Sequence, residues 1–391
     1  MPHRPLIVNA TATGHRVDGI AVYGVNLVKA LWRAGVDRPL TVVLNEDARR
    51  FFPDSEIPAG ASIRWVSARM SPSRGTRGNM RRWLFANHLA WQHRDALVFG
   101  LSQLEAPIAG GRGIVTVHDM IPWLFRGAHP RQYHFYRHYL GWAVNHALAV
   151  ITPSQATKDD VCRHYGIDDA RVHVIRHGSP VPVSGSAKSD KHRDRYILWI
   201  GRVDPTKNLP AVLAAFRMVE RQMDVRLVIA GEGSQVDLSA TGVDCGSLGR
   251  VTVLGPVSEA EKIALLDRAS VLVCSSLYEG FGFAPLEAMA RGCPVVTART
   301  GGLPEVCGDA AVYVDPRQPR LIADALLRVL TDPDLARDLV ERGRARTSTL
   351  TWEASVRAHL AVFDHVARLD LKGRSASAST RDGRIEADVL P

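Results

Sequence analysis

Short runs of β-branched and aliphatic residues alternate along this chain with longer stretches in which apolar residues recur at helical spacing. Such alternation is typical of strand–helix–strand units, so we predict an α/β fold built on parallel sheets. In the first half of the chain, the apolar runs predict strands at residues 6–9, 41–44, 62–66, 96–99, 114–117, 149–151 and 172–175. In the second half they predict strands at residues 196–200, 226–230, 250–254, 271–274, 294–297 and 311–314.

A segment at residues 181–194 separates the two sets of strands. It is poor in hydrophobic residues and rich in small and charged ones, as expected for an interdomain linker. We therefore predict two doubly wound, Rossmann-like domains, at residues 1–180 and 195–350, facing each other across a cleft. Open parallel sheets bind ligands at the carboxyl ends of their strands, so we expect functional residues in the loops that follow strands.

The end of the chain divides into two parts. A helical pattern at residues 351–371 predicts a helix that packs back toward the N-terminal domain. Residues 372–391 are low in sequence complexity, and we expect them to form a disordered tail.

The composition of the 391-residue chain, 46% hydrophobic and 23% charged, excludes a disordered, collagen-like or coiled-coil protein. No apolar run approaches the roughly 20 residues that a membrane-spanning helix needs, and the N-terminus shows no signal-peptide pattern. We therefore expect a cytoplasmic protein. The 5 cysteines include no Cys-x-x-Cys pair and match neither a disulfide framework nor a zinc site.

The formal net charge of +9 is concentrated in two stretches that lack acidic residues. The first carries Arg64, Arg69, Arg74, Arg77, Arg81, Arg82 and Arg94, with Trp65, Trp83, Phe85 and Trp91 among them, and the second carries Arg126, Arg131, Arg137 and Lys158. Such surfaces attract phosphate, and the alternative is a solvated basic face without a partner. Because no nucleic-acid-binding module accompanies the charge, we favour a membrane surface, with residues 79–85 in a helix at the lipid interface.

The loop after the predicted strand at 271–274 carries the strongest chemical signal. Gly280 and Gly282 permit close approach of a ligand, and amides at the helix start from Phe283 to Leu286 would form an anion site. Glu279 and Glu287 bracket these amides and are placed to accept hydrogen bonds from sugar hydroxyls. A capped helix start beside a surface turn is the alternative.

Two cationic residues follow the predicted strand at 196–200. Arg202 and Lys207 stand on a strand-to-helix turn, where they would converge on a diphosphate in place of a metal ion. An exposed ion pair between Arg202 and Asp204 is the alternative. The only Asp-x-Asp triplet begins at Asp332 and is interpreted as a helix cap, so no metal site is predicted.

In the first half of the chain, Gly19 and His118 are the candidate site residues. Gly19 opens a helix and would let a phosphate or sugar approach the backbone. The chain has no Gly-x-Gly-x-x-Gly spacing, so we expect no nicotinamide or flavin cofactor. His118 ends the predicted strand at 114–117 and faces the cleft, although a structural, hydrogen-bonded histidine is an equal alternative.

Together these residues resemble the family-four retaining glycosyltransferases of the GT-B fold, from residue 6 to about residue 371. The matching motifs are residues 279–287 as the family's Glu-x7-Glu element, residues 201–208 as its phosphate clamp, the loop at residues 301–305, Asp18-Gly19-Ile20, Val117-His118-Asp119 and Thr152-Pro153-Ser154. The chain departs from the family at Arg176-His177-Gly178, where relatives often have Asn-Gly, and we expect no change in chemistry at that hinge position.

The resemblance implies roles for the candidate residues, with no cofactor. Arg202 and Lys207 would stabilise the leaving diphosphate, and Glu287 would bind the ribose hydroxyls. Glu279 would hold the donor sugar together with the backbone at Phe281, Gly282 and Phe283. Gly19 would approach the diphosphate, and His118 would contact the donor sugar or the acceptor hydroxyl.

The resemblance is greatest to bacterial mannosyltransferases that build lipopolysaccharide or exopolysaccharide from GDP-mannose. It implies retaining, metal-independent transfer from a nucleotide-sugar donor to a lipid-linked glycan at the inner face of the cytoplasmic membrane, without nucleic acid. UDP-glucose or another nucleotide sugar is the alternative donor. A nucleotide-sugar epimerase and a catalytically silent nucleotide-sugar-binding protein are the alternative functions.

Overall fold

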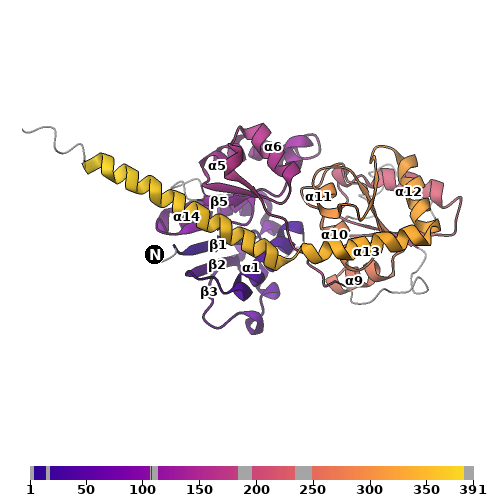
Figure 1. Cartoon of the computed structure of the whole chain (residues 1–391), viewed down its shortest axis with the longest axis horizontal. Helices are drawn as coiled ribbons and strands as arrows, with labels where there is room; N and C mark the ends of the chain where they lie inside the picture. The colour runs from indigo at the N-terminus through magenta and orange to yellow at the C-terminus, as the bar shows by residue number, and fades with distance from the viewer. Residues whose placement is uncertain are drawn as a thin grey trace, which may run out of the picture.

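The computed structural model describes residues 4–14, 18–105, 107, 113–183, 196–233 and 249–382, with side chains up to residue 369. It contains two parallel sheets, one with strand order β3-β2-β1-β4-β5-β6-β7 and the other with order β10-β9-β8-β11-β12-β13. Figure 1 shows the two resulting domains side by side, each with helices packed around its sheet. The predicted α/β class is confirmed.

Every strand of the two sheets lies within one residue of its predicted bounds. The first sheet comprises β1 (Leu6–Asn9), β2 (Leu40–Asn45), β3 (Ser62–Val66), β4 (Leu97–Gly100), β5 (Gly113–Thr116), β6 (Ala149–Thr152) and β7 (Val172–Val174). The second comprises β8 (Tyr196–Ile200), β9 (Arg226–Ala230), β10 (Val251–Gly255), β11 (Val271–Cys274), β12 (Val295–Ala298) and β13 (Val312–Val314). The central strands β1, β4, β5, β6 and β11 are buried along their whole length, because helices cover both faces of each sheet.

The helices follow the strands in the order expected for doubly wound domains. Those of the first domain are α1 (Gly19–Ala34), α2 (Gly75–Gln92), α3 (Ile121–Leu124), α4 (Pro130–His134), the π-helix η6 (Phe135–Leu140), α5 (Gly141–His146) and α6 (Gln155–Tyr165). Those that follow are the 3₁₀ turn η9 (Pro205–Lys207), α7 (Leu209–Val219), α9 (Glu259–Arg268), α10 (Phe283–Ala290), α11 (Leu303–Cys307), α12 (Pro319–Thr331), α13 (Pro333–Thr349) and α14 (Trp352–Asp382).

The last helix, α14, returns to the first domain and packs along α1, as Figure 1 shows in yellow. Val356, Phe363 and Val366 lie in the same hydrophobic core as Leu27 and Leu31 of α1. The helix continues through residues 372–382, so the prediction of disorder was wrong there. This segment contains alanines and no proline, and each residue added to an existing helix gains one backbone hydrogen bond, whereas starting a new helix orders several residues for a single bond. Residues 383–391 lie outside the described residues.

The chain passes between the domains twice, and the two crossings are hydrogen-bonded to each other. The Ser179 amide donates to the Leu350 carbonyl at 2.8 Å, and the Trp352 indole donates to the Ser179 carbonyl at 3.0 Å. These contacts place the start of α14 beside the end of the first domain. The predicted linker at 181–194 lies outside the described residues beyond Val183.

Buried histidines surround Tyr23 where α14 meets the first domain. The Tyr23 ring lies 4.9 Å from the His118 ring and 4.5 Å from the His177 ring, and its hydroxyl lies 2.9 Å from His359 Nε2. His359 Nδ1 lies 2.8 Å from the Ser355 carbonyl, which can only accept, so Nδ1 carries the proton and Nε2 accepts from Tyr23. Burial lowers the pKa of both His118 and His359 to about 4.

These depressed pKa values make stability depend on pH. Below a pH of about 6.5, His359 binds a proton in the unfolded chain but stays neutral in the folded protein. The free energy of unfolding therefore falls as the pH drops. Replacing His359→Phe should lower the free energy of unfolding at pH 7.5, because the Tyr23 hydroxyl loses its acceptor. At pH 5.0 the difference in free energy of unfolding between wild type and variant should be smaller by about 2 kcal/mol, because only the wild type loses stability through protonation of His359 in the unfolded chain. Urea unfolding at both pH values measures this, with the exposed His138→Phe as the control. A constant difference would contradict the assignment.

Candidate functional site

Lys207 and Glu279 meet at the carboxyl edge of the second sheet. Lys207 ends η9, which follows β8, and Glu279 lies in the loop that follows the neighbouring strand β11. Lys207 Nζ donates to Glu279 Oε1 at 2.5 Å, and the Ser276 hydroxyl donates to the same oxygen at 2.7 Å. Two of the predicted site residues are therefore in direct contact.

The contact with Glu279 keeps the Lys207 ammonium charged. Burial acts to lower the pKa of Lys207, but the Glu279 carboxylate and its hydrogen bond outweigh this effect and raise the pKa above its usual value. A positive charge is therefore fixed at the sheet edge at neutral pH.

Arg202, which follows the same strand β8, is largely exposed to solvent. Its guanidinium is 3.3 Å from Asp204, and its side chain is 59% exposed, so the predicted alternative of an exposed ion pair is present. The Asp204 carboxylate also accepts from the Thr206 amide and hydroxyl, at 3.0 and 2.7 Å. His129 of the first domain places its Nε2 3.5 Å from the same carboxylate. His129 belongs to none of the motifs that the sequence pattern singles out.

Helix α10 begins at the tip of the loop that carries Glu279. Its N-cap residue, Gly282, has φ 114°, a conformation that L side chains rarely adopt. A Cβ at Gly280 would lie 1.9 Å from the His118 carbonyl oxygen, so only glycine fits against the first domain there. The predicted availability of the Leu286 amide was wrong, because it donates to the Gly282 carbonyl at 3.4 Å in the first helical turn. The amides of Phe283 and Ala284 precede that bond.

Glu287 lies on α10 and is paired with a lysine that the sequence analysis missed. Lys262 Nζ of α9 donates to Glu287 Oε1 at 2.8 Å, inside the second domain. Burial raises the pKa of Glu287 to about 7, and the Lys262 ammonium opposes this rise. The signal for Lys262 was a charged residue on the inward stripe of an amphipathic helix, four positions before the buried Leu266.

The start of α1 faces the start of α10 across the domain boundary. Asp18 caps α1 by accepting from the Ala21 amide at 2.9 Å, and a Cβ at Gly19 would lie 3.7 Å from the Phe283 ring. Burial raises the pKa of Asp18, and the Arg202 guanidinium opposes this effect from the second domain. The structure therefore brings the predicted site residue Gly19 to the same place as the Phe283 turn.

His118 is oriented by a backbone carbonyl. Its Nε2 lies 2.8 Å from the Leu101 oxygen, which can only accept, so Nε2 carries the proton and Nδ1 has the free lone pair. With its pKa lowered by burial, the ring is neutral at pH 7. The hydrogen-bonded structural histidine that we named as the alternative is therefore present, with one acceptor nitrogen left.

Helix α6 and its N-cap residue, Ser154, make hydrogen bonds to loops of the second domain. The Ser154 hydroxyl donates to the Gly280 carbonyl at 2.6 Å, and the Tyr278 hydroxyl donates to Asp160 at 2.7 Å. The Glu305 carboxylate accepts from the backbone amides of Gln155 and Ala156 at 2.9 and 3.0 Å. A carboxylate from one domain thus caps a helix of the other, a long-range contact that local sequence patterns do not encode.

The departure at Arg176-His177-Gly178 fills the boundary between the domains. The His177 ring stacks on Phe283 at 5.4 Å with an interplanar angle of 14°, and it lies 4.7 Å from the Phe281 ring. Arg176 lies 3.6 Å from Glu305. This segment therefore contacts the loop at the start of α10.

Helix α2 carries three of the seven arginines of the first basic stretch, together with exposed apolar side chains. Met80, Leu84 and Trp91 are 59%, 55% and 57% exposed on its outer face, and Arg77 and Arg81 are exposed beside them. The edge-to-face contact of the Trp83 and Tyr139 rings at 5.3 Å joins α2 to η6, where Arg137 and His138 are exposed.

Arg82 does not belong to this surface, which corrects the sequence analysis. It is buried and donates to the Met70 carbonyl at 2.9 Å and to Asn79 Oδ1 at 2.5 Å. Burial raises the pKa of Glu105 to about 7, and the positive charge of Arg82 opposes this rise. No helix among the described residues has the length and apolar character to cross a membrane.

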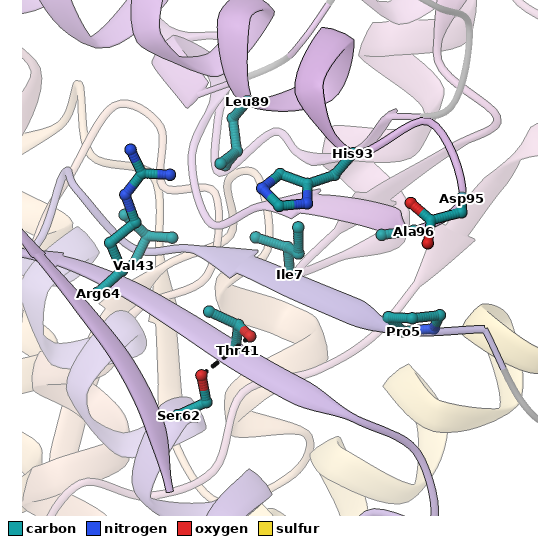
Figure 2. A pocket seen from close by; sticks show the side chains of 10 residues that line it. All are labelled: Pro5, Ile7, Thr41, Val43, Ser62, Arg64, Leu89, His93, Asp95 and Ala96. Atoms are coloured by element: carbon teal, nitrogen blue, oxygen red, sulfur yellow. Dashed lines mark hydrogen bonds between the residues drawn. The ribbon is translucent and has the colours of Figure 1, made fainter.

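A cavity of about 350 Å³ lies elsewhere, in the first domain (Figure 2). It is lined by residues at the amino ends of β1 to β4, among them Pro5, Thr41, Ser62 and Ala96. In a parallel sheet this edge is opposite the carboxyl edge that carries Gly19 and His118. The cavity is therefore separate from the site.

Two further predictions concern metal ligands and thiols. Asp332 is the N-cap of α13 and accepts from the amides of Asp334 and Leu335, at 3.1 and 3.0 Å, which confirms its interpretation as a helix cap. The four cysteines within the described residues form no disulfide, and Cys245 lies outside them.

Each of the two domains matches the model of a known protein family. Residues 17–180 match the model of Glycosyltransferase Family 4, and residues 186–346 match that of Glycosyl transferases group 1. The chain belongs to these glycosyltransferases. Each model covers one of the two domains.

Glycogen synthase from Mycobacterium tuberculosis (strain CDC 1551 / Oshkosh) is 32% identical to this glycosyltransferase over 243 residues, which are 61% of this chain and 58% of the relative. O-antigen chain mannosyltransferase B from Escherichia coli is 27% identical over 288 residues, 70% of this chain and 76% of the relative. The crystal structure of Anabaena HepE in complex with UDP and glucose superposes with a TM-score of 0.69 at 18% identity, covering 92% of this chain and 100% of that one. This likeness shows the GT-B fold.

The Glu305 contact gives a test of how the domains of this glycosyltransferase are held together. Replacing Glu305→Ala should speed hydrogen exchange of the Gln155 and Ala156 amides by one to two orders of magnitude, because each loses a charge-assisted acceptor. Hydrogen-exchange mass spectrometry measures the change, with the exposed Glu341→Ala as the control. Equal protection in the variant and wild type would contradict the interdomain cap.

Proposed function

We propose that this protein transfers mannose from GDP-mannose, with retention of configuration and without a metal ion, to a hydroxyl of a growing lipid-linked cell-surface glycan. The Lys207–Glu279 pair beside the start of α10 carries the proposal. The ammonium lies at the sheet edge, and its partner Glu279 is in the loop that leads into α10, whose first backbone amides are left free for an anion such as a diphosphate.

The proposed chemistry uses these charges as the glycosidic bond breaks. Negative charge develops on the departing diphosphate, so Lys207, Arg202 and the α10 amides stabilise the transition state more than the ground state. These groups supply the positive charge that a metal ion supplies in other transferases. No protein nucleophile is needed if the acceptor attacks on the face from which the diphosphate leaves, with a phosphate oxygen taking its proton.

The first domain would present the acceptor from the opposite side. Gly19 approaches the start of α10 most closely, and His118 Nδ1 offers a neutral hydrogen-bond acceptor. Contacts such as Ser154 to Gly280 bring the domains together, which would exclude water and suppress hydrolysis of the donor.

The choice of donor rests on the named relatives. The O-antigen mannosyltransferase relative supports mannose, and its alignment covers more of both chains than that of glycogen synthase. The glycogen synthase relative and the UDP and glucose bound to HepE support UDP-glucose as the second candidate.

The exposed face of α2 supports peripheral attachment to the cytoplasmic membrane from the cytoplasmic side. Arginines attract anionic headgroups, and the exposed Met80, Leu84 and Trp91 would enter the interface between headgroups and acyl chains. A lipid-linked acceptor would then be held at the surface where the protein docks.

A panel of radiolabelled nucleotide sugars with a crude membrane acceptor tests the transfer. We expect label from GDP-mannose to enter the lipid-linked fraction, with no change when a chelator is added. Lys207→Ala should lower turnover at least a hundredfold, because it removes a major electrostatic stabiliser of the leaving group. Lys29→Ala, which removes a lysine that pairs with Glu56 of the first domain, is the matched control. Full turnover in Lys207→Ala, or a metal requirement, would contradict the mechanism.

Liposome flotation tests the membrane surface. The double variant Arg77→Glu/Arg81→Glu should lose most binding to anionic liposomes at low salt, because it reverses two charges on the exposed face of α2. Arg320→Glu/Arg328→Glu makes the same change on exposed positions of α12 in the other domain and should bind like wild type. Equal flotation of the two double variants would rule out this surface.

A further inference from the structure

Lys262 is a charged residue in an inward position of α9. The helix begins with a capping box in which Ser258 and Glu261 satisfy each other's backbone amides, so its register is fixed. In that register Lys262 is buried together with Leu266, four residues later, and Ala269, seven residues later. An apolar residue would satisfy this stripe at no electrostatic cost, so the ammonium needs a separate explanation.

The ammonium joins two carboxylates of different exposure. Lys262 Nζ lies 2.8 Å from Glu287 Oε1 and 2.9 Å from Glu259 Oε2, and the exposed side-chain fractions are 11% for Lys262, 4% for Glu287 and 52% for Glu259. Glu259 is solvated and does not need a partner. Glu287 is buried, and its charge is compensated by Lys262.

Without that ammonium, Glu287 would lose its charge. Burial raises the pKa of Glu287 to about 7 although the Lys262 ammonium opposes this rise, so removing the lysine would raise the pKa further and favour the protonated carboxyl at neutral pH. A protonated carboxyl has lost the charge that strengthens a hydrogen bond accepted from a hydroxyl.

The position of Glu287 matches a ribose. It lies four residues after Phe283, one helical turn beyond the amides at the start of α10. If those amides bind the diphosphate, the next part of a nucleotide is its ribose, whose hydroxyls are recognised by carboxylates in other doubly wound folds.

We propose that Lys262 is a positioning residue that holds Glu287 as an oriented carboxylate, with Oε2 directed to the ribose hydroxyls of the donor nucleotide. The assignment rests on the proposed function. Lys262 itself does not touch the donor, and it acts by fixing the charge and direction of Glu287.

Calorimetric titration with GDP and 2′,3′-dideoxy-GDP tests the assignment on the full chain. Wild type should bind GDP more tightly than the dideoxy analogue. Lys262→Met should weaken GDP binding about tenfold at pH 7, should bind the two nucleotides more nearly alike, and should regain affinity for GDP toward pH 9 as Glu287 ionises. Lys262→Arg should keep the preference for ribose, and Glu259→Gln, which removes the solvated partner, should match wild type.

A double variant separates recognition from folding. Lys262→Met/Glu287→Gln buries no unpaired charge, so it should fold, and it should bind both nucleotides alike at every pH. A purely structural lysine would instead lower the melting temperature of Lys262→Met while leaving the preference for ribose and its pH profile unchanged, which would overturn the proposal. Wild-type protein that binds neither GDP nor UDP would overturn the proposed function, and this assignment with it.

Discussion

A carboxylate taken out of water must be matched by donors, and this constraint organises the edge of the second sheet. Glu279 is matched by Lys207, Glu287 by Lys262, and Glu305 by two amides of α6. Each partner comes from a different segment of the chain. The three pairs therefore tie the loop before α10 to η9, α10 to α9, and α11 to the first domain.

The same pairing prepares the site for an anionic ligand. The Lys207 ammonium already has a partner in Glu279, so it is charged and positioned before a diphosphate binds. Little reorganisation is then needed as charge develops on the leaving group, and this is the condition under which fixed charges accelerate a reaction most. Glu279 also accepts from Ser276, and the Lys207 ammonium has further N–H groups that can donate to a phosphate while its bond to Glu279 stays in place.

The strands were predictable because parallel strands covered on both faces form nearly continuous apolar runs, whatever the rest of the chain does. Capping residues such as Asp332 were predictable because their partners lie two and three residues away. Arg82 was misplaced because it turns inward and donates to the Met70 carbonyl, 12 residues earlier in the chain. Glu305 and Lys262 could be seen in the sequence, but their partners are 150 and 25 residues away, and only the fold brings them together.

The two domains approach each other closely through backbone contacts as well as through charged groups. The Gly280 carbonyl accepts from Ser154, and its Cα lies against the His118 carbonyl, so any side chain at Gly280 would force the domains apart. His177 then fills the space beside this contact by stacking on Phe283, which a shorter asparagine at that position would not do. The departure from the family pattern therefore adds packing where the start of α10 meets the first domain. The chemistry proposed for the site uses the backbone amide of Phe283 and not the ring on which His177 stacks.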